Sequence, residues 1–419
     1  MSELRRIALL SLHTSPLAAL GGRETGGMNV YVREVAAHLA RLGIAVDVFT
    51  RRSSTTEAEI REIAQHDGGA IARLVQITAG PRSRVEKEEM LPFTAAFADG
   101  VEAFCAREDL TYDVIYSHYW LAVEAGALLA ERWDVPHAAM FHTLAEVKLR
   151  ARASESEPRE RIDAERRQVA GLDRIVAATE HERRLLTQIY RVPTSRVSVV
   201  PLGVDLDQFA PRSQVEARAA LGIAPDERMV LAIGRMEPLK GFDILIRAIA
   251  QLSDRRNIVL SIIGGDERAS RELDALRAVA TEVGVTDAVR FLGARPHEEL
   301  PAYYNAADVV AVPSFYESFG LVAVEAMASG VPVVASRVGG LASTVADGRT
   351  GYLIPWRCPE PFAEKIELLL RNEELRRALG QAAAARMQAY SWAEVARSVA
   401  DVLGTLIEEH AASPERRLG

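Results

Sequence analysis

Short apolar runs alternate with longer amphipathic stretches along the first half of the chain. The short runs predict buried strands at 7–12, 45–50, 71–77, 114–118, 138–142 and 174–178, and the amphipathic stretches predict helices at 28–43, 88–106 and 121–133. This alternation is the βαβ rhythm of a doubly wound parallel sheet. Residues 144–170 interrupt it with a highly charged helical pattern, which we interpret as an exposed excursion.

The same rhythm restarts in the second half. A turn-rich stretch at 202–211 separates a strand at 197–201 from new strands at 229–233, 259–263, 289–292, 309–312 and 333–336. We therefore expect an N-terminal Rossmann-like domain at 1–205 and a C-terminal one at 206–391, an α/β architecture whose two domains face each other across a ligand-binding cleft. We expect residues 392–419 to form a C-terminal helix. One interpretation is that this helix crosses back to the first domain.

Composition narrows the class of protein. The chain has 419 residues, 48% of them hydrophobic and 26% charged, with a formal net charge of −8. The length suits two domains, and the composition is that of a globular protein. The net negative charge argues against a nucleic-acid partner. Cys105 and Cys358 lie far apart without metal-type spacing, so we expect a reducing, cytoplasmic setting. No apolar run approaches the roughly 18 residues that span a bilayer.

Residues 313–332 contain two carboxylates in a suggestive place. Glu317 lies in a turn after the predicted strand at 309–312, and Glu325 lies on the helix predicted to follow. At the carboxyl end of a parallel strand, the next helix N-terminus suits phosphate, while carboxylates suit sugar hydroxyls. The alternative is a capping Glu317 and a solvated Glu325. The apolar neighbours of Glu325 favour a carboxylate that has a partner.

Two loops that leave strands carry further candidate binding residues. In the first, Gly26 and Gly27 allow an anion or sugar to approach the N-terminus of a helix, although a merely flexible loop is the alternative. The sequence lacks G-x-G-x-x-G, which excludes a nicotinamide enzyme. In the second loop, Arg235 and Lys240 together could neutralise a diphosphate leaving group, unless they are an ordinary solvated pair.

Two histidines end neighbouring predicted strands of the first domain. His118 closes the strand at 114–118, and His142 closes the strand at 138–142. A single histidine at a strand end is more often structural than catalytic. Two histidines at adjacent strand ends favour positions that line the ligand cleft.

Together these motifs resemble a known family, the retaining, nucleotide-sugar-dependent glycosyltransferases of group 1 (family 4) with the GT-B fold. The resemblance covers essentially the whole chain. Several stretches look closest to the inositol-phosphate N-acetylglucosaminyltransferases of mycothiol synthesis, and sucrose-phosphate synthases share much of the pattern. The stretches that carry the resemblance are 12–16, 26–32, 117–121, 142–148, 201–209, 234–241 and 317–325.

The resemblance implies which residues bind the nucleotide sugar. The donor diphosphate would be held by Arg235 and Lys240, with Gly27 close to it. Glu325 would bind the ribose and Glu317 the hydroxyls of the donor sugar. These assignments would make the second domain the main donor-binding domain.

The resemblance also implies the catalytic set. His142 would lie beside the donor sugar near the reacting carbon and would act with Arg235, Lys240 and Glu317. The reaction would proceed on one face of the sugar, with the leaving diphosphate accepting the proton of the acceptor. The protein would contribute positioning and charge stabilisation, so no cofactor would be required.

The acceptor phosphate would be bound by four residues of the first domain: Lys87, Tyr119, Thr143 and Arg161. His13 and Asn29 match positions that contact the acceptor. One departure concerns a metal that is bound in the relative, because Val331 replaces a threonine and Asn305 replaces an arginine there. We therefore expect no metal.

The implied function is transfer of a sugar, from UDP-N-acetylglucosamine or UDP-glucose, to a phosphorylated polyol or sugar such as inositol phosphate, with retention. A sucrose-phosphate synthase that uses fructose 6-phosphate is one alternative, and a non-catalytic sugar-nucleotide-binding protein is another. The partners would be small molecules, with neither nucleic acid nor a transmembrane segment, and a homodimer is left open. The sequence determines neither the donor sugar and nucleobase nor the acceptor.

Overall fold

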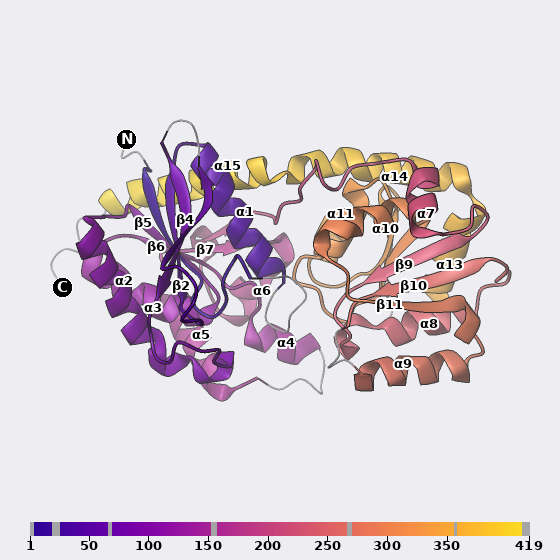
Figure 1. Ribbon diagram of the computed structural model, residues 1–419, viewed down its shortest axis with the longest axis horizontal. Coiled ribbons are helices and arrows are strands. Elements are labelled where there is room, and N and C mark those ends of the chain that lie inside the picture. Colours follow the sequence, from indigo (N-terminus) through magenta and orange to yellow (C-terminus); the bar gives the residue numbers. More distant parts are fainter. Residues whose placement is uncertain are drawn as a thin grey trace. The chain divides into compact units, whose positions relative to one another are not determined.

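The computed structural model describes residues 4–18, 26–65, 69–151, 157–265, 270–355 and 358–412 (Figure 1). The chain divides into two compact units. Unit 1 runs to Pro201 and takes in the chain from Trp392 onward, and unit 2 is Leu202–Ser391. In each unit a parallel sheet is covered by helices on both faces, as the βαβ rhythm predicted.

The described part of unit 1 contains an eight-stranded sheet of order β3-β4-β2-β1-β5-β6-β7-β8. All neighbours are parallel except β3, which pairs antiparallel with β4 at the edge. The sequence rhythm missed β3 because most of its side chains are exposed, so it lacks an apolar run. The strands are β1 Arg6–Leu10, β2 Ala45–Arg51, β3 Ile60–Gln65, β4 Ile71–Ile77, β5 Val114–His118, β6 His137–Met140, β7 Arg174–Ala177 and β8 Val197–Val199.

Helices α2, α3 and α5 cover one face of this sheet, and α1 and α15 cover the other (Figure 1). Helix α15 packs against α1, where the ring centroids of Tyr31 and Trp392 are 6.0 Å apart. The helices of unit 1 are α1 Gly27–Arg41, α2 Thr94–Glu108, α3 Trp120–Trp133, α4 Ala145–Ala151, α5 Arg159–Gly171, α6 Glu180–Ile189 and α15 Trp392–Ala411, with 3-10 turns η1 Lys87–Glu89, η2 Leu91–Phe93 and η3 Thr194–Arg196.

Unit 2 contains, among the described residues, a six-stranded parallel sheet of order β11-β10-β9-β12-β13-β14. Every residue of β12 and β13 is buried, which explains their continuous apolar sequences. The edge strand β14 was not predicted. The strands are β9 Arg228–Ile233, β10 Ile258–Ile263, β11 Val289–Gly293, β12 Val309–Val312, β13 Val333–Ser336 and β14 Gly351–Ile354.

Two helices of unit 2 begin at capping side chains. The Ser213 side chain accepts the N–H of Glu216 at the start of α7, and the Asn372 side chain accepts the N–H of Leu375 at the start of α14. The helices are α7 Gln214–Leu221, α8 Phe242–Ala250, α9 Ser270–Glu282, α10 Leu300–Ala306, α11 Leu321–Ala328, α12 Leu341–Thr344, α13 Pro359–Arg371 and α14 Glu373–Met387, with 3-10 turns η4 Pro238–Lys240, η6 Thr286–Ala288, η7 His297–Glu299 and η8 Gln388–Tyr390.

The strand orders locate the ligand-binding edge of each sheet. In unit 1 the strands β2 to β4 lie on one side of β1, and the chain then returns to place β5 on the other side of β1. In unit 2 it does the same with β9 and β12. Helices leave these neighbouring strands toward opposite faces, which opens a crevice at their carboxyl ends where ligands bind in such folds.

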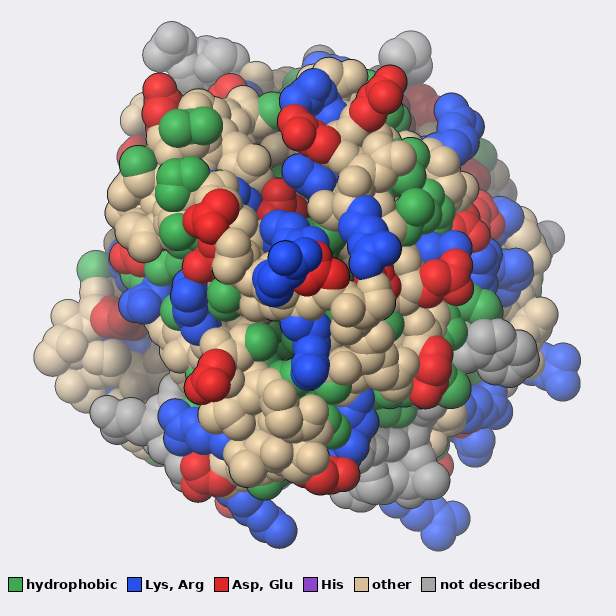
Figure 2. All heavy atoms as spheres, turned by 90° about the vertical axis from the view of Figure 1, so that its right-hand side faces the viewer, with side chains coloured by type: hydrophobic (Ala, Val, Ile, Leu, Met, Phe, Trp, Pro, Cys, Tyr) green, Lys and Arg blue, Asp and Glu red, His purple; other side chains and the backbone are tan. Residues whose placement is uncertain are grey.

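One face of the molecule carries acidic and basic side chains mixed with small, scattered hydrophobic groups (Figure 2). None of the helices in the described ranges is both long and apolar enough to cross a membrane.

Candidate functional site

The crevice of unit 2 brings two predicted donor residues into contact. Lys240 ends the loop after β9, and Glu317 lies in the loop after β12. The Lys240 ammonium lies 2.7 Å from a carboxylate oxygen of Glu317. The backbone N–H of Phe315 donates to Leu239 O at 2.8 Å, which ties the two loops together. A cation and a carboxylate are therefore held side by side at the switch point of the sheet.

The close approach of these loops depends on glycine. Gly241 has φ +66°, and a Cβ added there would lie 2.3 Å from the carbonyl oxygen of Pro313. Gly339 has φ +48°, and its Cβ would lie 1.9 Å from Glu317 O. Any side chain at these positions would push the Glu317 loop away from its neighbours.

We expect Gly241→Ala to destabilise unit 2 more than Gly222→Ala does. Gly222 has nearly the same backbone strain, with φ +67°, but nothing lies within 4 Å of an added Cβ. Gly222→Ala should therefore cost only the strain of a left-handed alanine, about 1–2 kcal/mol, whereas Gly241→Ala adds the clash with Pro313. Chemical denaturation of both variants measures the difference. Equal losses would mean that the loop relaxes freely.

Arg235 lies on the same loop but is less engaged. Its side chain is 59% exposed, and a guanidinium nitrogen lies 2.7 Å from a carboxylate oxygen of Glu237. An exposed pair of this kind contributes little to stability. The side chain is accordingly accessible to a ligand, and its contact with the donor stays a prediction.

Glu325 is buried, 8% exposed, and has two partners. One carboxylate oxygen lies 2.8 Å from His297 Nε2, and the other accepts the hydroxyl of Tyr304 at 2.7 Å. The expectation that an apolar helix would supply this charge with a partner is thus confirmed, and a solvated Glu325 is wrong. The ribose contact stays a prediction.

The crevice of unit 1 gathers predicted acceptor residues. His13 follows β1 and Tyr119 follows β5, and their ring centroids are 4.4 Å apart. Tyr119 has φ +75° and His142 has φ +61°, conformations that non-glycine residues rarely adopt. Such backbone strain often occurs at functional positions.

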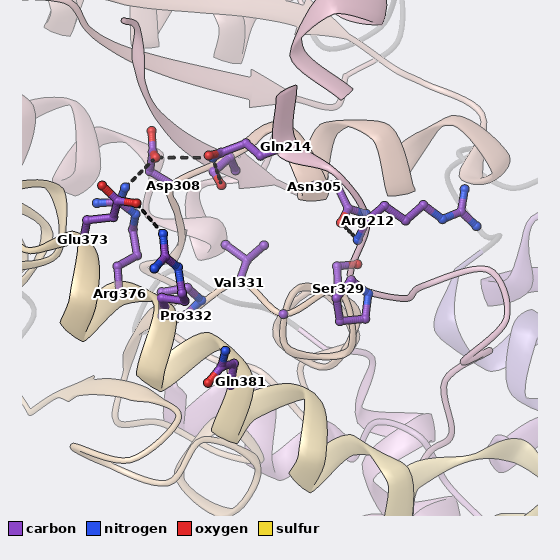
Figure 3. Close-up of a pocket in the computed structure, with 14 residues that line it drawn as sticks. Arg212, Gln214, Asn305, Asp308, Ser329, Val331, Pro332, Glu373, Arg376 and Gln381 are labelled. Carbon is purple, nitrogen blue, oxygen red and sulfur yellow. Dashed lines mark hydrogen bonds and ion pairs between the residues drawn. The ribbon is translucent and has the colours of Figure 1, made fainter. Parts of the chain in front are cut away.

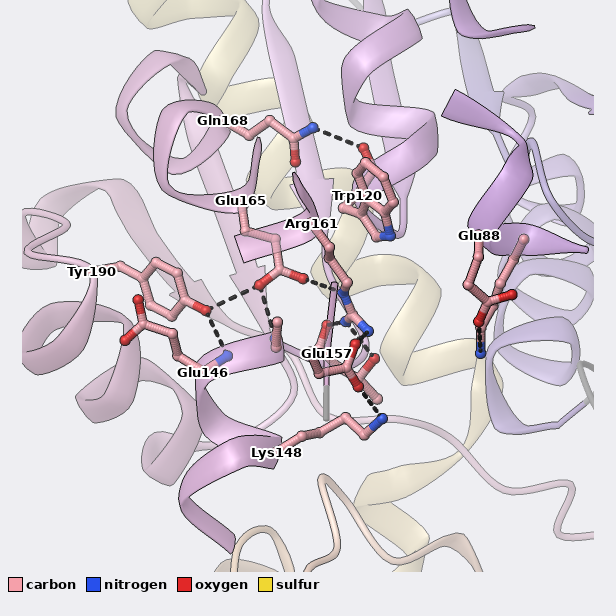
Figure 4. Close-up of polar contacts among 12 residues, drawn as sticks. Glu88, Trp120, Glu146, Lys148, Glu157, Arg161, Glu165, Gln168 and Tyr190 are labelled. Atoms are coloured by element: carbon pink, nitrogen blue, oxygen red, sulfur yellow. Dashed lines mark hydrogen bonds and ion pairs between the residues drawn. The ribbon is translucent and has the colours of Figure 1, made fainter. Parts of the chain in front are cut away.

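Arg161 lies at the centre of this group (Figure 4). Its guanidinium carbon is 4.9 Å from the centroid of the Tyr119 ring. It donates to Thr143 O at 2.9 Å and to Thr143 Oγ1 at 3.2 Å. It also donates to Glu165 at 2.7 Å and to Glu157 at 2.8 Å. The structure therefore brings Tyr119, Thr143 and Arg161 together.

The interpretation of residues 144–170 as an exposed excursion is wrong for the inward face of α5, although the outer face of this helix is exposed. Arg161, Ala164, Glu165, Gln168 and Val169 of α5 are buried, and Gln168 donates to the carbonyl of Trp120. Two charged residues of α5, Arg161 and Glu165, face inward, where they neutralise each other, while Arg166 on the same helix is exposed. A sequence pattern of alternating acid and base does not distinguish a solvated face from a buried ion-pair network.

Three other predicted residues have no contact with Arg161 among the hydrogen bonds and ion pairs of the described residues. Lys87 belongs to η1, is 38% exposed and lies 3.7 Å from Glu88. Gly27 begins α1. Asn29 uses its side-chain amide to join the start of α1 to the preceding loop, because it accepts from Gly26 N and donates to Thr14 Oγ1 and Ser15 O. Their contacts with substrates stay predictions.

The two strand-end histidines contact each other. His118 Nδ1 lies 2.9 Å from His142 Nε2, and His118 is fully buried. Burial lowers the pKa of His142 to about 3. Burial and the nearby charges of Lys87 and Arg161 lower the pKa of His13 to about 3 as well. Both rings are neutral at physiological pH, so they can donate or accept a hydrogen bond without carrying charge.

These buried histidines predict acid sensitivity. Burial also lowers the pKa of His137 to about 4, so the unfolded chain, with pKa near 6.5, binds these protons first. Stability present above pH 6.5 is then lost as pH falls. Glu182, whose pKa burial raises to about 7, acts in the opposite direction but is a single group. We expect a net loss exceeding about 1.4 kcal/mol per pH unit below pH 6, measured by denaturation at several pH values. Constant stability from pH 6.5 to 4.5 would contradict this.

A pocket of about 310 Å³ in unit 2 includes the positions that the family resemblance associates with a metal (Figure 3). The Asn305 side chain is engaged with backbone groups, accepting an N–H at 2.6 Å and donating to Pro301 O at 2.9 Å. Asp308 is held by Arg218 at 2.7 Å, and Val331 has no ligand atom in its side chain. Only Ser329 offers, among the described lining residues, a buried hydroxyl without a hydrogen-bond partner. These residues do not fit a metal ion.

Sequence reasoning missed several residues around the site. Glu157 and Glu165 each lie four positions from Arg161, a helical spacing that could have indicated an ion-pair network. His297 and Tyr304, the partners of Glu325, carry no such local signal because they come from another part of the chain.

Comparison with known proteins identifies the family. A model described as Glycosyltransferase Family 4 matches residues 25–208, and one described as Glycosyl transferases group 1 matches residues 213–386. D-inositol 3-phosphate glycosyltransferase of Corynebacterium glutamicum (strain R) is 40% identical over 422 residues, covering 99% of this chain and 100% of the relative. The same enzyme of Actinosynnema mirum is 42% identical over 410 residues, covering 96% and 97%. The chain belongs to the group 1 glycosyltransferases, and it is an enzyme of that class.

Solved structures agree on the fold. Sucrose-phosphate synthase from Thermosynechococcus elongatus matches with a TM-score of 0.86 and 32% identity over 98% of this chain and 100% of that chain. Anabaena Alr3699/HepE in complex with UDP and glucose matches with a TM-score of 0.72 and 21% identity over 96% and 100%, which shows the fold alone. The predicted GT-B class of two Rossmann-like domains is confirmed.

Proposed function

We propose that the protein transfers a sugar from a nucleoside diphosphate sugar, UDP-N-acetylglucosamine or UDP-glucose, to inositol phosphate with retention at the anomeric carbon. The observation that carries the proposal is the convergence of Tyr119, Thr143 and Arg161 at the crevice of unit 1. A fork of guanidinium donors beside two hydroxyls suits a phosphate group. The names of the relatives at 40 to 42% identity point to the same acceptor.

The donor would bind at the crevice of unit 2. Lys240 and Arg235 would neutralise the diphosphate, Glu325 would accept from the ribose, and Glu317 would accept from the sugar hydroxyls. The contact between Lys240 and Glu317 supports this assignment, because it keeps a cation and a hydroxyl acceptor adjacent. Charge that develops on the diphosphate as the glycosidic bond breaks would be stabilised by cations already in place.

Unit 1 would supply the acceptor and one group near the reacting carbon. His142 is neutral and anchored by His118, so it would orient the donor sugar by hydrogen bonding rather than by charge. The acceptor hydroxyl would attack the face from which the diphosphate leaves, and the diphosphate oxygen would take its proton. Gly27, His13, Asn29 and Lys87 would complete the site. A cytoplasmic location and a homodimer also stay predictions.

Fructose 6-phosphate is the second candidate acceptor, because sucrose-phosphate synthase is the structural match at 32% identity. A screen of UDP-sugars against inositol phosphate and fructose 6-phosphate, with products read by mass spectrometry, distinguishes the two. We expect turnover with inositol phosphate. Turnover with fructose 6-phosphate alone would replace the proposal, and no turnover with any donor would favour a binding protein.

A further inference from the structure

Arg161, the central residue of the acceptor group, already has an acceptor for most of its N–H donors. Its side chain is 5% exposed and donates to Glu157, Glu165 and both oxygens of Thr143. A guanidinium group has five N–H donors. Four hydrogen bonds are already in place, so a phosphate that binds two of the donors at once has to replace one of the existing acceptors.

Glu165 is built into the fold. Its side chain is 0% exposed, and besides Arg161 it accepts the backbone N–H of Ala145 at 2.8 Å and the hydroxyl of Tyr190 at 3.0 Å. Moving it would leave a backbone N–H and a tyrosine hydroxyl unsatisfied in the interior. We therefore expect Glu165 to keep its position when a ligand binds.

Glu157 is held differently. In the part of the chain that the structure describes, its recorded partners are two cationic side chains, Arg161 and Lys148 (Figure 4). Its side chain is 6% exposed, and burial opposes its charge, but Arg161 and Lys148 together hold the pKa of this carboxyl below its usual value. A buried, ionised carboxylate that contacts only cations has the same environment that a bound phosphate needs.

Charge counting favours exchange over addition. Arg161 and Lys148 balance Glu157 and Glu165, so a phosphate dianion added to this group would bring two uncompensated negative charges. If the phosphate replaces Glu157, only one uncompensated negative charge remains. A singly charged ligand carries the same charge as the Glu157 carboxylate. It therefore competes poorly with this carboxylate, which the chain holds at the site at high effective concentration.

We propose that Glu157 occupies the anion site of the acceptor until a phosphate dianion displaces it, and that this competition makes Glu157 a specificity-determining residue against singly charged acceptors. The inference rests on the proposed function, in which Arg161 binds the acceptor phosphate.

The test compares methyl phosphate, a dianion at pH 8, with methyl sulfate, a monoanion of the same shape. Binding to the full chain is measured by titration calorimetry for wild type, Glu157→Gln and Glu157→Asp. We expect Glu157→Gln to bind methyl phosphate about tenfold more tightly than wild type does, because a competing charge-assisted hydrogen bond is removed. Methyl sulfate should bind measurably only to the variants. Glu157→Asp, which retains charge but has a shorter reach, covers the case in which Glu157→Gln does not fold.

Glu146→Gln is the matched control. It removes the same charge from α4, where Glu146 pairs with Arg150 and Arg166 and has no recorded contact with Arg161. It should bind methyl phosphate as wild type does. Binding that is unchanged or weaker in both Glu157 variants, while wild type binds, would overturn the inference and leave the phosphate site standing. If neither the wild type nor any variant binds methyl phosphate, unit 1 has no phosphate site at Arg161, and the proposed acceptor is wrong as well.

Discussion

Replacing Lys240 with alanine is expected to lower kcat by about 10²–10³ while the affinity for the free nucleoside stays nearly unchanged. The ammonium would face negative charge that grows on the diphosphate as the glycosidic bond breaks. A nucleoside without phosphates does not experience this interaction. Arg235→Ala should change kcat in the same direction. Steady-state kinetics and nucleoside titration provide both quantities.

Arg247→Ala is the control for the loss of a cation from unit 2. Arg247 lies on α8 and pairs with Glu282 at the surface, at 2.9 Å. Its removal should leave kcat unaltered. Because Lys240→Ala removes the cation beside Glu317, a thermal unfolding curve should establish that the variant is folded. A variant with normal kcat and only an increased KM would refute the role of Lys240 in stabilising the leaving group.

An acceptor without its phosphate is expected to be used about 10³-fold less efficiently in kcat/KM than the phosphorylated acceptor. The unphosphorylated acceptor would lose the charge-assisted hydrogen bonds that its phosphate makes with Arg161. Arg161→Ala should erase most of this preference and leave donor binding intact. Arg161→Ala also leaves the buried carboxylate of Glu165 without its cationic partner, which can destabilise unit 1.

Arg161→Lys is therefore the sharper variant, because it keeps the charge near Glu165 but loses the planar fork. The preference should fall to within about tenfold. Arg166→Lys is the control, since Arg166 lies on the same helix, is exposed and pairs with Glu146. Equal use of both acceptors by wild type would exclude a phosphate site in unit 1.

Local patterns predicted the elements of the fold because each strand is short and continuous in sequence. The runs at 71–77, 114–118, 309–312 and 333–336 coincide with β4, β5, β12 and β13. Buried parallel strands have apolar side chains on both faces, so their sequences carry the full signal. The edge strand β3 was missed because most of its side chains are exposed, whereas β14 is largely buried but is only four residues long and begins with glycine.

The candidate site was predictable in part for the same reason. In doubly wound sheets, residues that follow central strands meet at one edge, so His118 and His142 could be grouped from sequence position alone, and they are in contact. The apolar neighbours of Glu325 correctly required a partner for its charge. They did not identify His297 or Tyr304, because a buried charge constrains the kind of partner and not its place in the chain.

The sequence by itself determined the fold class and which residues lie at the strand ends, since both follow from hydrophobic periodicity and turn chemistry along the chain. Only the tertiary structure decided that Arg161 and Glu165 of α5 are buried, that Arg161 already has several acceptors, and that Glu157 and Glu165 differ in how firmly they are held. Whether a charged side chain lies in water or in a buried ion pair depends on the elements packed over it. That environment comes from residues distant in sequence, which no local pattern contains.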